Sequence, residues 1–250
     1  MNELAVAKVL RDKGFELFQQ PRKMCPFTGN LTADKLLNDL VGTPHAYVIA
    51  CIMDRGIKAE RAWLIPYLIA VKLGDFRFST LTALSHDQCV ALMTIPAPLH
   101  RFPATMAESM YLAVKLIAAR YVGNAGLIWA NNPGSATVVN RFLEFKGVGP
   151  KIATMAANIL VRDLKVPFSD YHSIDISVDV HIRNVFTRLG LVPFEASDEQ
   201  IIYTARAFSP DFPGLLDLPS WEIGRTWCKP TAPLCSECYM HAICPTAEAS

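Results

Sequence analysis

The sequence has 250 residues, a length that suits one large domain or two small ones. Hydrophobic residues make up 51% of it and charged residues 19%, which excludes a disordered chain. The formal net charge is +1, which excludes a uniformly basic protein, so binding to nucleic acid would require positive charge gathered on one face.

The apolar runs are too short for a membrane segment. The longest, residues 46–53 and 62–71, fall far below the roughly 20 residues that span a bilayer. Charged side chains occupy the N-terminus where a signal peptide needs an apolar stretch, namely Glu3, Lys8, Arg11, Asp12 and Lys13. We therefore expect a cytoplasmic protein. Thiols stay reduced there, so the seven cysteines are expected to be metal ligands or core residues rather than disulfides.

Helical signals dominate the chain from beginning to end. Thr32 is expected to cap a helix that runs to Leu40. Apolar residues recur at helical spacing in five further segments, residues 47–53, 59–73, 88–93, 104–121 and 136–145. Capping boxes begin helices at two places, Ser85–Gln88 and Ser197–Gln200. Loops are expected at residues 21–30, 76–80 and 131–135. No strand pattern appears, and the predicted fold is all-α.

A tight turn between two helices is predicted near residue 147. Gly147 and Gly149 permit positive φ angles, and Pro150 suits the first position of a new helix. The backbone N–H groups at such a helix start attract an anion, for example a DNA phosphate. An ordinary helix–turn–helix connection explains this turn about equally well. As a phosphate site, it would consist of Lys146, Gly147, Val148, Gly149 and Pro150.

Lys151 follows this turn and is the candidate nucleophile. It lies in the first turn of the new helix, where the helix dipole disfavours a second positive charge. A neutral lysine attacks aldehyde carbons and forms Schiff bases. The alternative is a lysine that only binds phosphate, and the sequence leaves both open.

Asp179 is the second candidate catalytic residue. It precedes a helix marked by Ile182, Val185 and Phe186 and ended by Gly190, so its simplest role is that of the N-cap. A capping carboxylate is also ionised and held in place, and this suits a group that stabilises a developing cation or orients water. The two roles are compatible.

The strongest motif is a run of cysteines near the C-terminus. Cys228, Cys235, Cys238 and Cys244 have the spacing C-x6-C-x2-C-x5-C. Four clustered thiolates hold zinc or an iron–sulfur cluster, and the presence of only one C-x2-C pair favours [4Fe–4S] over zinc. The spacing does not separate a structural role from electron transfer. Cys25, Cys51 and Cys89 are scattered and are expected to be core thiols.

Taken together, the hairpin, the aspartate segment and the cysteine spacing resemble the helix-hairpin-helix DNA glycosylases of the endonuclease III family. The resemblance covers roughly residues 43–245 and rests on Gly147–Lys151, Val178–Ile182 and the four cysteines. It implies a six-helix barrel with the hairpin in residues 41–165. It also implies a discontinuous [4Fe–4S] domain made of residues 1–40 and 166–250, with a DNA cleft between the two domains.

The resemblance further implies an enzyme of base-excision repair. Family members flip a damaged nucleotide out of duplex DNA. Those with a lysine at the position of Lys151 displace the base, form a Schiff base with the sugar and cleave the strand by β-elimination. The expected activity is therefore that of a DNA glycosylase and abasic-site lyase acting on damaged pyrimidines, with Lys151 and Asp179 catalytic. His181 and Arg183, in the aspartate segment, are expected to contact DNA.

Three departures from the family pattern leave the substrate open. About ten extra residues, around 166–174, separate the lysine and aspartate segments and are expected to form a loop beside the pocket. Asp54 and Arg55 stand where endonuclease III has a glutamine-containing segment that fills the gap left by the flipped base, and both are expected to contact DNA. Leu99 or His100 is expected to insert into the base stack.

Two other functions remain possible from the sequence alone. In a monofunctional glycosylase, Asp179 would activate water and Lys151 would only contact DNA. In a non-catalytic iron–sulfur protein, the chain would bind DNA without cleaving it. In each case the expected partner is double-stranded DNA, with no membrane contact. The protein is expected to be a monomer located in the cytoplasm at the nucleoid.

Overall fold

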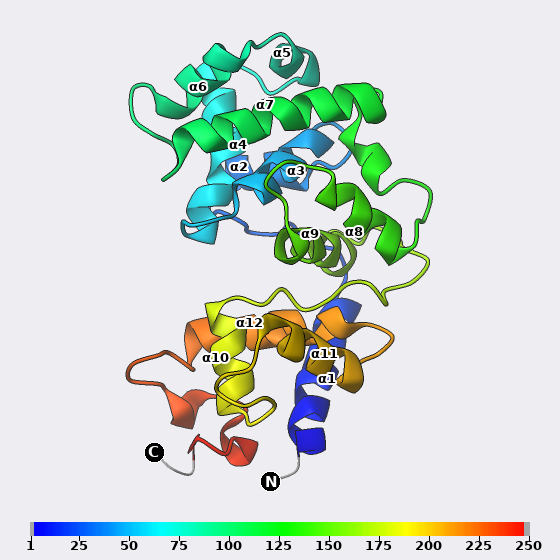
Figure 1. The fold of residues 1–250 in the computed structure, drawn as a ribbon, viewed down its shortest axis with the longest axis vertical. Helices are drawn as coiled ribbons and strands as arrows, with labels where there is room; N and C mark the ends of the chain where they lie inside the picture. The colour runs from blue at the N-terminus through cyan, green and yellow to red at the C-terminus, as the bar shows by residue number, and fades with distance from the viewer. Residues whose placement is uncertain (1–2, 248–250) are drawn as a thin grey trace.

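The computed structural model describes residues 3–247, and every regular element in this range is a helix. The all-α prediction is therefore confirmed. The elements fall into two halves, one above the other in Figure 1. The upper half contains α2 (Leu31–Asn38), α3 (Pro44–Met53), α4 (Ala59–Leu73), α5 (Phe78–Thr82), α6 (His86–Thr94), α7 (Pro103–Arg120), η1 (Ala125–Ile128), α8 (Ser135–Leu143) and α9 (Pro150–Arg162).

The lower half is built from both ends of the chain. It contains α1 (Glu3–Gln19), α10 (Val180–Arg188), α11 (Asp198–Phe208), η2 (Pro213–Leu216), α12 (Asp217–Thr226), η3 (Cys235–Glu237) and η4 (His241–Ile243). No helix among residues 3–247 is long and apolar enough to cross a lipid bilayer.

Helix α3 forms the centre of the upper half. Every residue from Pro44 to Met53 is buried, as expected for a helix that is apolar on all sides. The hydroxyl of Tyr47 on α3 donates a hydrogen bond of 2.7 Å to the carbonyl oxygen of Ala156. This bond fixes the central helix to α9, the helix that carries Lys151.

The lower half has a separate apolar core. Leu10 of α1 packs in the same buried cluster as Phe186 of α10, Ile201 of α11 and Ile223 of α12. The N-terminal helix thus belongs with the C-terminal helices. Helix α2 does not follow it, because α2 packs against α3 and α4 in the upper half. Placing all of residues 1–40 in the lower unit is therefore wrong for α2.

Helix starts agree with the sequence where the capping signal is local. Ser85 and Ser197 both form the predicted capping boxes. The predicted cap at Thr32 is wrong, because the side chain of Asn30 accepts hydrogen bonds from the amides of Thr32 and Ala33 and begins the helix there. The loop expected at residues 76–80 is wrong for its last three residues, which begin the short helix α5.

The extra segment at residues 166–174 braces the fold. The Asp170 carboxylate accepts hydrogen bonds from the amide and the hydroxyl of Ser135, and so caps the start of α8. Tyr171 stacks on Phe212, with 4.9 Å between ring centroids. These contacts give the segment a structural role at the start of α8. Its expected place beside the pocket stays a prediction.

Candidate functional site

The predicted hairpin is present between α8 and α9, but its two glycines do different things. Gly147 has a φ angle of +86°, so it provides the left-handed turn. Gly149 has a φ angle of −102° and is the N-cap of α9, where it offers no side chain to the helix end. Pro150 occupies the first turn as predicted. The amides of Lys151 and Ile152 therefore begin an uncapped helix and are available to an anion.

Lys151 lies at this open helix end. Its side chain is exposed, and it forms no hydrogen bond or ion pair within residues 3–247. Lys146, which lies just before the turn, is paired instead: its ammonium lies 2.6 Å from the carboxylate of Glu108. Of these two lysines, only Lys151 has an ammonium left for an external partner.

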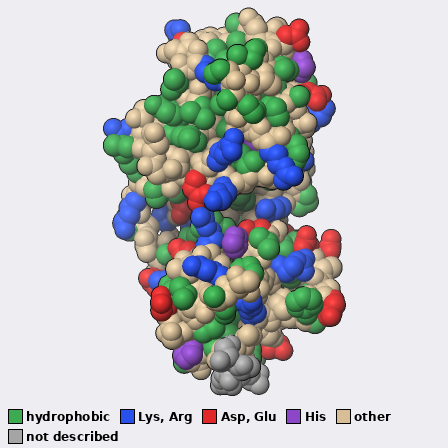
Figure 2. All heavy atoms as spheres, turned by 90° about the vertical axis from the view of Figure 1, so that its left-hand side faces the viewer, with side chains coloured by type: hydrophobic (Ala, Val, Ile, Leu, Met, Phe, Trp, Pro, Cys, Tyr) green, Lys and Arg blue, Asp and Glu red, His purple; other side chains and the backbone are tan. Residues whose placement is uncertain are grey.

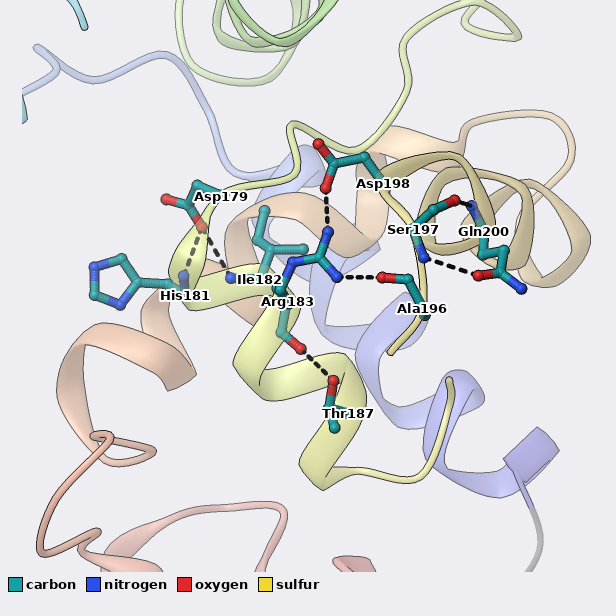
Figure 3. A network of polar contacts seen from close by, with 9 residues as sticks. All are labelled: Asp179, His181, Ile182, Arg183, Thr187, Ala196, Ser197, Asp198 and Gln200. Atoms are coloured by element: carbon teal, nitrogen blue, oxygen red, sulfur yellow. Dashed lines mark hydrogen bonds and ion pairs between the residues drawn. The ribbon is translucent and has the colours of Figure 1, made fainter. Parts of the chain in front are cut away.

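Asp179 caps the start of α10, as predicted. Its Oδ1 atom accepts hydrogen bonds of 2.9 Å from the amides of both His181 and Ile182 (Figure 3). Its other carboxylate oxygen accepts no hydrogen bond from the described part of the chain. The cap therefore holds the carboxylate in one orientation and leaves one oxygen for a reacting group.

A third charged residue, Asp54, belongs to the same site. It ends α3, and its Oδ2 atom accepts a hydrogen bond of 3.1 Å from Trp63 Nε1. Burial raises the pKa of Asp54, whereas the Trp63 hydrogen bond and the positive charge of Lys151 lower it, and the charge of Asp179 raises it. Lys151 and Asp179 are thus both close enough to act on Asp54. A contact also links the two elements that carry Lys151 and Asp179, because the hydroxyl of Ser177 lies 3.5 Å from the hydroxyl of Thr154 in α9.

The loop after Asp54 packs on the hairpin. A Cβ atom on Gly147 would lie 3.0 Å from Nη1 of Arg55, so the guanidinium lies directly against the turn and would have to shift slightly for a larger residue there. Arg55 forms no ion pair within the described residues. Its guanidinium therefore adds positive charge beside the uncapped start of α9.

Leu99 and His100, which are predicted to insert into the base stack, are both partly or fully buried. His100 is only 1% exposed, and its Nδ1 atom accepts a hydrogen bond of 2.9 Å from the amide of Phe102. Burial lowers the pKa of His100. The expectation that His100 inserts into DNA is therefore wrong, because its ring is part of the interior. Leu99 is half-buried against the upper core, and the exposed ring on this loop belongs to Phe102, at 44%.

The two other predicted DNA contacts in the aspartate segment differ from each other. The guanidinium of Arg183 donates to the carbonyl of Ala196 and to the carboxylate of Asp198 (Figure 3). Because both partners belong to the protein, the expectation that Arg183 contacts DNA is not supported. His181 is half-buried, and its ring points away from the Arg183 network in Figure 3.

The surface is hollowed at the waist of the molecule, between its upper and lower halves (Figure 2). Figure 2 shows Lys and Arg side chains gathered on both sides of this hollow, between the upper and lower halves. An ion pair of 2.7 Å between Glu60 and Arg225 joins the two halves. Basic side chains are therefore gathered at this hollow, among a few acidic ones, although the net charge is only +1 (Figure 2).

The four C-terminal cysteines line one pocket. Cys228, Cys235, Cys238 and Cys244 surround it together with apolar side chains that include Leu189, Ile223, Trp227 and Met240. All four thiols are partly buried. Burial raises the pKa of Cys238, and the charges of the other three cysteines raise it further. The spacing signal in the sequence thus corresponds to four thiols around a common space.

Hydrogen-bond donors approach the pocket from α10. Arg188 Nη1 lies 3.6 Å and Asn184 Nδ2 lies 3.9 Å from the sulfur of Cys228. Arg188 also donates to the carbonyl of Lys229 at 2.7 Å. Within residues 3–247, no group of three or more His, Cys, Asp or Glu side chains is arranged to hold a metal ion. The thiols lie around the pocket rather than at one point.

Comparison with known proteins gives partial matches in sequence. Endonuclease III of Thermotoga maritima is 29% identical over 106 residues, which cover 42% of this chain and 45% of that protein. Endonuclease III of Synechocystis sp. is 34% identical over 83 residues, 30% of this chain and 34% of that protein. The matches thus span less than half the length of these relatives. No family model matches the chain.

The match in fold covers the whole chain. A solved non-covalent complex of endonuclease III with DNA aligns with a TM-score of 0.65 at 15% identity, covering 100% of this chain and 98% of that one. A thermostable thymine-DNA glycosylase aligns with a TM-score of 0.64 at 15% identity, covering 98% and 97%. The fold is therefore that of the helical DNA glycosylases. Within that class the chain is similar to endonuclease III in sequence and in fold, which confirms the resemblance predicted from its motifs.

Proposed function

We propose that this protein is a DNA glycosylase with abasic-site lyase activity that acts on damaged pyrimidines in duplex DNA. One observation carries the proposal. The unpaired ammonium of Lys151 stands at an uncapped helix start, and Ser177, two residues before the capping carboxylate of Asp179, contacts the same helix at Thr154. A similar solved structure supports it, since that structure is of a trapped covalent intermediate between endonuclease III and DNA.

The geometry supports a specific division of roles. The first amides of α9 bind a phosphate beside the damaged nucleotide, and the neutral amine of Lys151 attacks C1′ of its sugar. The bond from C1′ to the base breaks, and the base leaves with a proton. The C1′–O4′ bond then breaks, O4′ takes up a proton, and the lysine nitrogen and C1′ form a protonated Schiff base. Loss of the C2′ proton expels the 3′ phosphate, and hydrolysis of the Schiff base by water releases the lysine. The free oxygen of Asp179 stabilises the positive charge that develops at the sugar.

Borohydride trapping on a duplex with one abasic site tests this proposal. Sodium borohydride reduces a Schiff base to a stable amine, so wild-type protein is expected to become linked to the DNA. Lys151→Ala is expected to abolish the adduct because it removes the nucleophile. Lys146→Ala is the matched control, since it removes a lysine from the same hairpin that pairs with Glu108. Base release without any adduct would contradict the lyase and would favour the monofunctional glycosylase. Binding without either product would favour the non-catalytic protein.

The proposal includes a [4Fe–4S] cluster held by Cys228, Cys235, Cys238 and Cys244. The residues fit such a group, because four thiols surround one apolar pocket and donors from Asn184 and Arg188 reach the sulfur of Cys228. When bound, the cluster would supply structural cross-linking of the C-terminal loop and a redox-active centre. None of the steps at Lys151 passes through it.

Iron and sulfide analysis of the anaerobically purified protein tests the cofactor. We expect about four iron atoms per chain and a yellow-brown colour from thiolate-to-iron absorption. Cys235→Ser is expected to lower the iron content and the thermal stability, whereas Cys89→Ser, a buried thiol in α6, is expected to leave the iron content unchanged. A colourless protein with one zinc ion per chain would contradict this assignment.

The remaining parts of the proposal concern organisation and context. We infer a barrel unit over residues 41–165 joined by α2, and a lower unit formed by α1 and most of residues 166–247. Phe168, Ile174 and Phe212 depart from this division, because they pack in the upper core. The partner is double-stranded DNA bound at the hollow of Figure 2. We propose that the protein acts there as a monomer, at the nucleoid. Light scattering of the free protein and of its DNA complex tests the monomer, and a mass of two chains would contradict it.

A further inference from the structure

Asp217 is a mostly buried carboxylate for which the proposed function gives no role. It is the first residue of α12, which has no side-chain cap at its N-terminus. Its Oδ1 atom accepts a hydrogen bond of 2.6 Å from the backbone amide of Ser177. Ser177 lies two residues before Asp179. The carboxylate therefore holds the short extended segment that leads into the cap of α10.

Ser177 connects this segment to the helix of Lys151 as well. Its hydroxyl lies 3.5 Å from the hydroxyl of Thr154, a buried residue of α9. The Thr154 hydroxyl in turn donates to the carbonyl of Pro150 at 2.9 Å, directly before Lys151. Ser177 thus touches α12 through its amide and α9 through its side chain. The two elements that carry Lys151 and Asp179 meet at this residue.

Helix α12 supports the start of α10 at a second point. Gly224 of α12 lies so close to His181 that a Cβ atom on the glycine would be 2.7 Å from the Cβ atom of His181. Close approach of this kind leaves α10 little freedom to shift along α12. The start of α10 is therefore held by α12 on both sides of Asp179, through Ser177 before it and His181 after it.

On the basis of the function proposed above, we propose that Asp217 is a positioning residue that fixes the carboxylate of Asp179 relative to Lys151. It does so by accepting the amide hydrogen bond of Ser177, and it touches neither DNA nor the reacting atoms. Without this bond, the segment 177–179 loses its fixed point on α12, and the cap of α10 loses its alignment with α9.

The groups around Asp217 shift the pKa of its carboxyl group in both directions. Burial raises its pKa, the positive charge of Arg162 and the Ser177 amide lower it, and the nearby charge of Asp179 raises it again. Because the net shift is upward, the folded state binds this proton more tightly than the unfolded state does. Folding stability contributed by this group therefore falls as pH rises through its pKa range. A neutral acceptor here is expected to keep the positioning bond without destabilising the fold.

Three variants separate positioning from general stability. Asp217→Ala removes the acceptor of the Ser177 amide, whereas Asp217→Asn keeps an acceptor oxygen and removes the charge. Asp163→Asn is the matched control, because Asp163 pairs with the same Arg162 at 2.7 Å but is not an acceptor for Ser177. We expect borohydride trapping at saturating enzyme to slow by about 10- to 100-fold in Asp217→Ala, since small misplacements of catalytic groups have effects of this size. Trapping is expected to stay near the wild-type rate in the other two.

Affinity for a duplex with a tetrahydrofuran abasic analogue is measured in parallel with the thermal midpoint. Asp217→Ala is expected to bind this duplex within about twofold of wild type, because the lost interaction acts on the reaction step. A wild-type trapping rate in Asp217→Ala would overturn the proposal. The proposal would also be overturned if Asp217→Asn lost trapping rate as Asp217→Ala does. It would be overturned as well if the loss of rate in Asp217→Ala came with an equal loss of DNA affinity and a lower thermal midpoint.

Hydrogen exchange provides a readout that does not depend on activity. The amides of His181 and Ile182 donate to Asp179, so their exchange reports whether the cap is held. We expect faster exchange in residues 176–183 of Asp217→Ala and wild-type exchange in Asp217→Asn. Unchanged exchange in Asp217→Ala would overturn the proposal. If the wild-type protein forms no adduct at all, the lyase proposal fails, and this measurement still decides whether Asp217 holds Asp179.

Discussion

Two helix N-termini carry the proposed catalytic residues, and they are built in opposite ways. Helix α9 begins after Gly149, which offers no side chain, so its end stays uncapped. Helix α10 begins after Asp179, whose carboxylate accepts the amides of His181 and Ile182. The first end keeps its free N–H groups and carries the additional charge of Lys151. The second has its positive end neutralised by its own side chain.

This difference assigns separate tasks to the two helices. An uncapped start attracts a phosphate, and Lys151 stands beside it with an ammonium that forms no ion pair in the described chain. A capped start binds no phosphate, but it holds a carboxylate in a fixed place. One helix therefore suits the anionic backbone of the substrate and the nucleophile. The other suits the positive charge that develops at the sugar.

The largest effect is expected from changing the capped end. Asp179→Asn keeps a good N-cap, so the free energy of unfolding is expected to change by less than about 0.5 kcal/mol, whereas Asp179→Ala is expected to lose about 1 kcal/mol. Both variants are expected to slow the proposed reaction by about 100-fold or more, because neither carries the charge. Urea denaturation and single-turnover base release measure the two quantities. Wild-type turnover in Asp179→Asn would mean that this residue is only a cap.

A smaller effect is expected from changing the uncapped end, where the two glycines form a matched pair. Gly147→Ala places a side chain at a φ angle of +86° and within 3.0 Å of Arg55 Nη1, so we expect a loss of about 1–2 kcal/mol in unfolding free energy and weaker DNA binding. Gly149→Ala has an ordinary φ angle and meets nothing within 4 Å, so a loss below about 1 kcal/mol is expected. Equal losses in the two variants would contradict this account of the turn.

The parts of the site that the sequence predicted depend on local chemistry. Pro150 and Asp179 occupy their helix positions because a fixed φ angle and a capping carboxylate act within one turn of the chain. The four cysteines are close in sequence, so their meeting around one pocket requires only a short loop. These features can therefore be predicted without knowing how the rest of the chain packs.

The parts that the sequence did not predict depend on tertiary contacts. His100 resembles an exposed loop residue, but the fold buries its ring beside the backbone of Met53 and Arg55. Asp217 gave no local signal, since its partner Ser177 lies 40 positions earlier in the chain. The sequence predicts that Asp54 contacts DNA, and only the structure shows that the charges of Lys151 and Asp179 act on its carboxylate. Such pairings are set by how the helices pack.

The smallest effect on DNA affinity is expected from changing Arg183. This prediction tests whether DNA affinity depends on where a positive charge lies or only on how many positive charges the protein carries. Its guanidinium is bound to Ala196 and Asp198, so Arg183→Ala is expected to leave DNA affinity and its dependence on salt unchanged. Arg55 forms no ion pair in the described chain and lies on the hairpin, so Arg55→Ala is expected to weaken binding and to lower the salt slope by about one. Fluorescence anisotropy over a series of salt concentrations measures both variants on one duplex. Since both changes remove one positive charge, a difference between them would arise from position. Equal slopes would indicate that the protein attracts DNA only through its total charge, and that the uncapped start of α9 has no special part in binding.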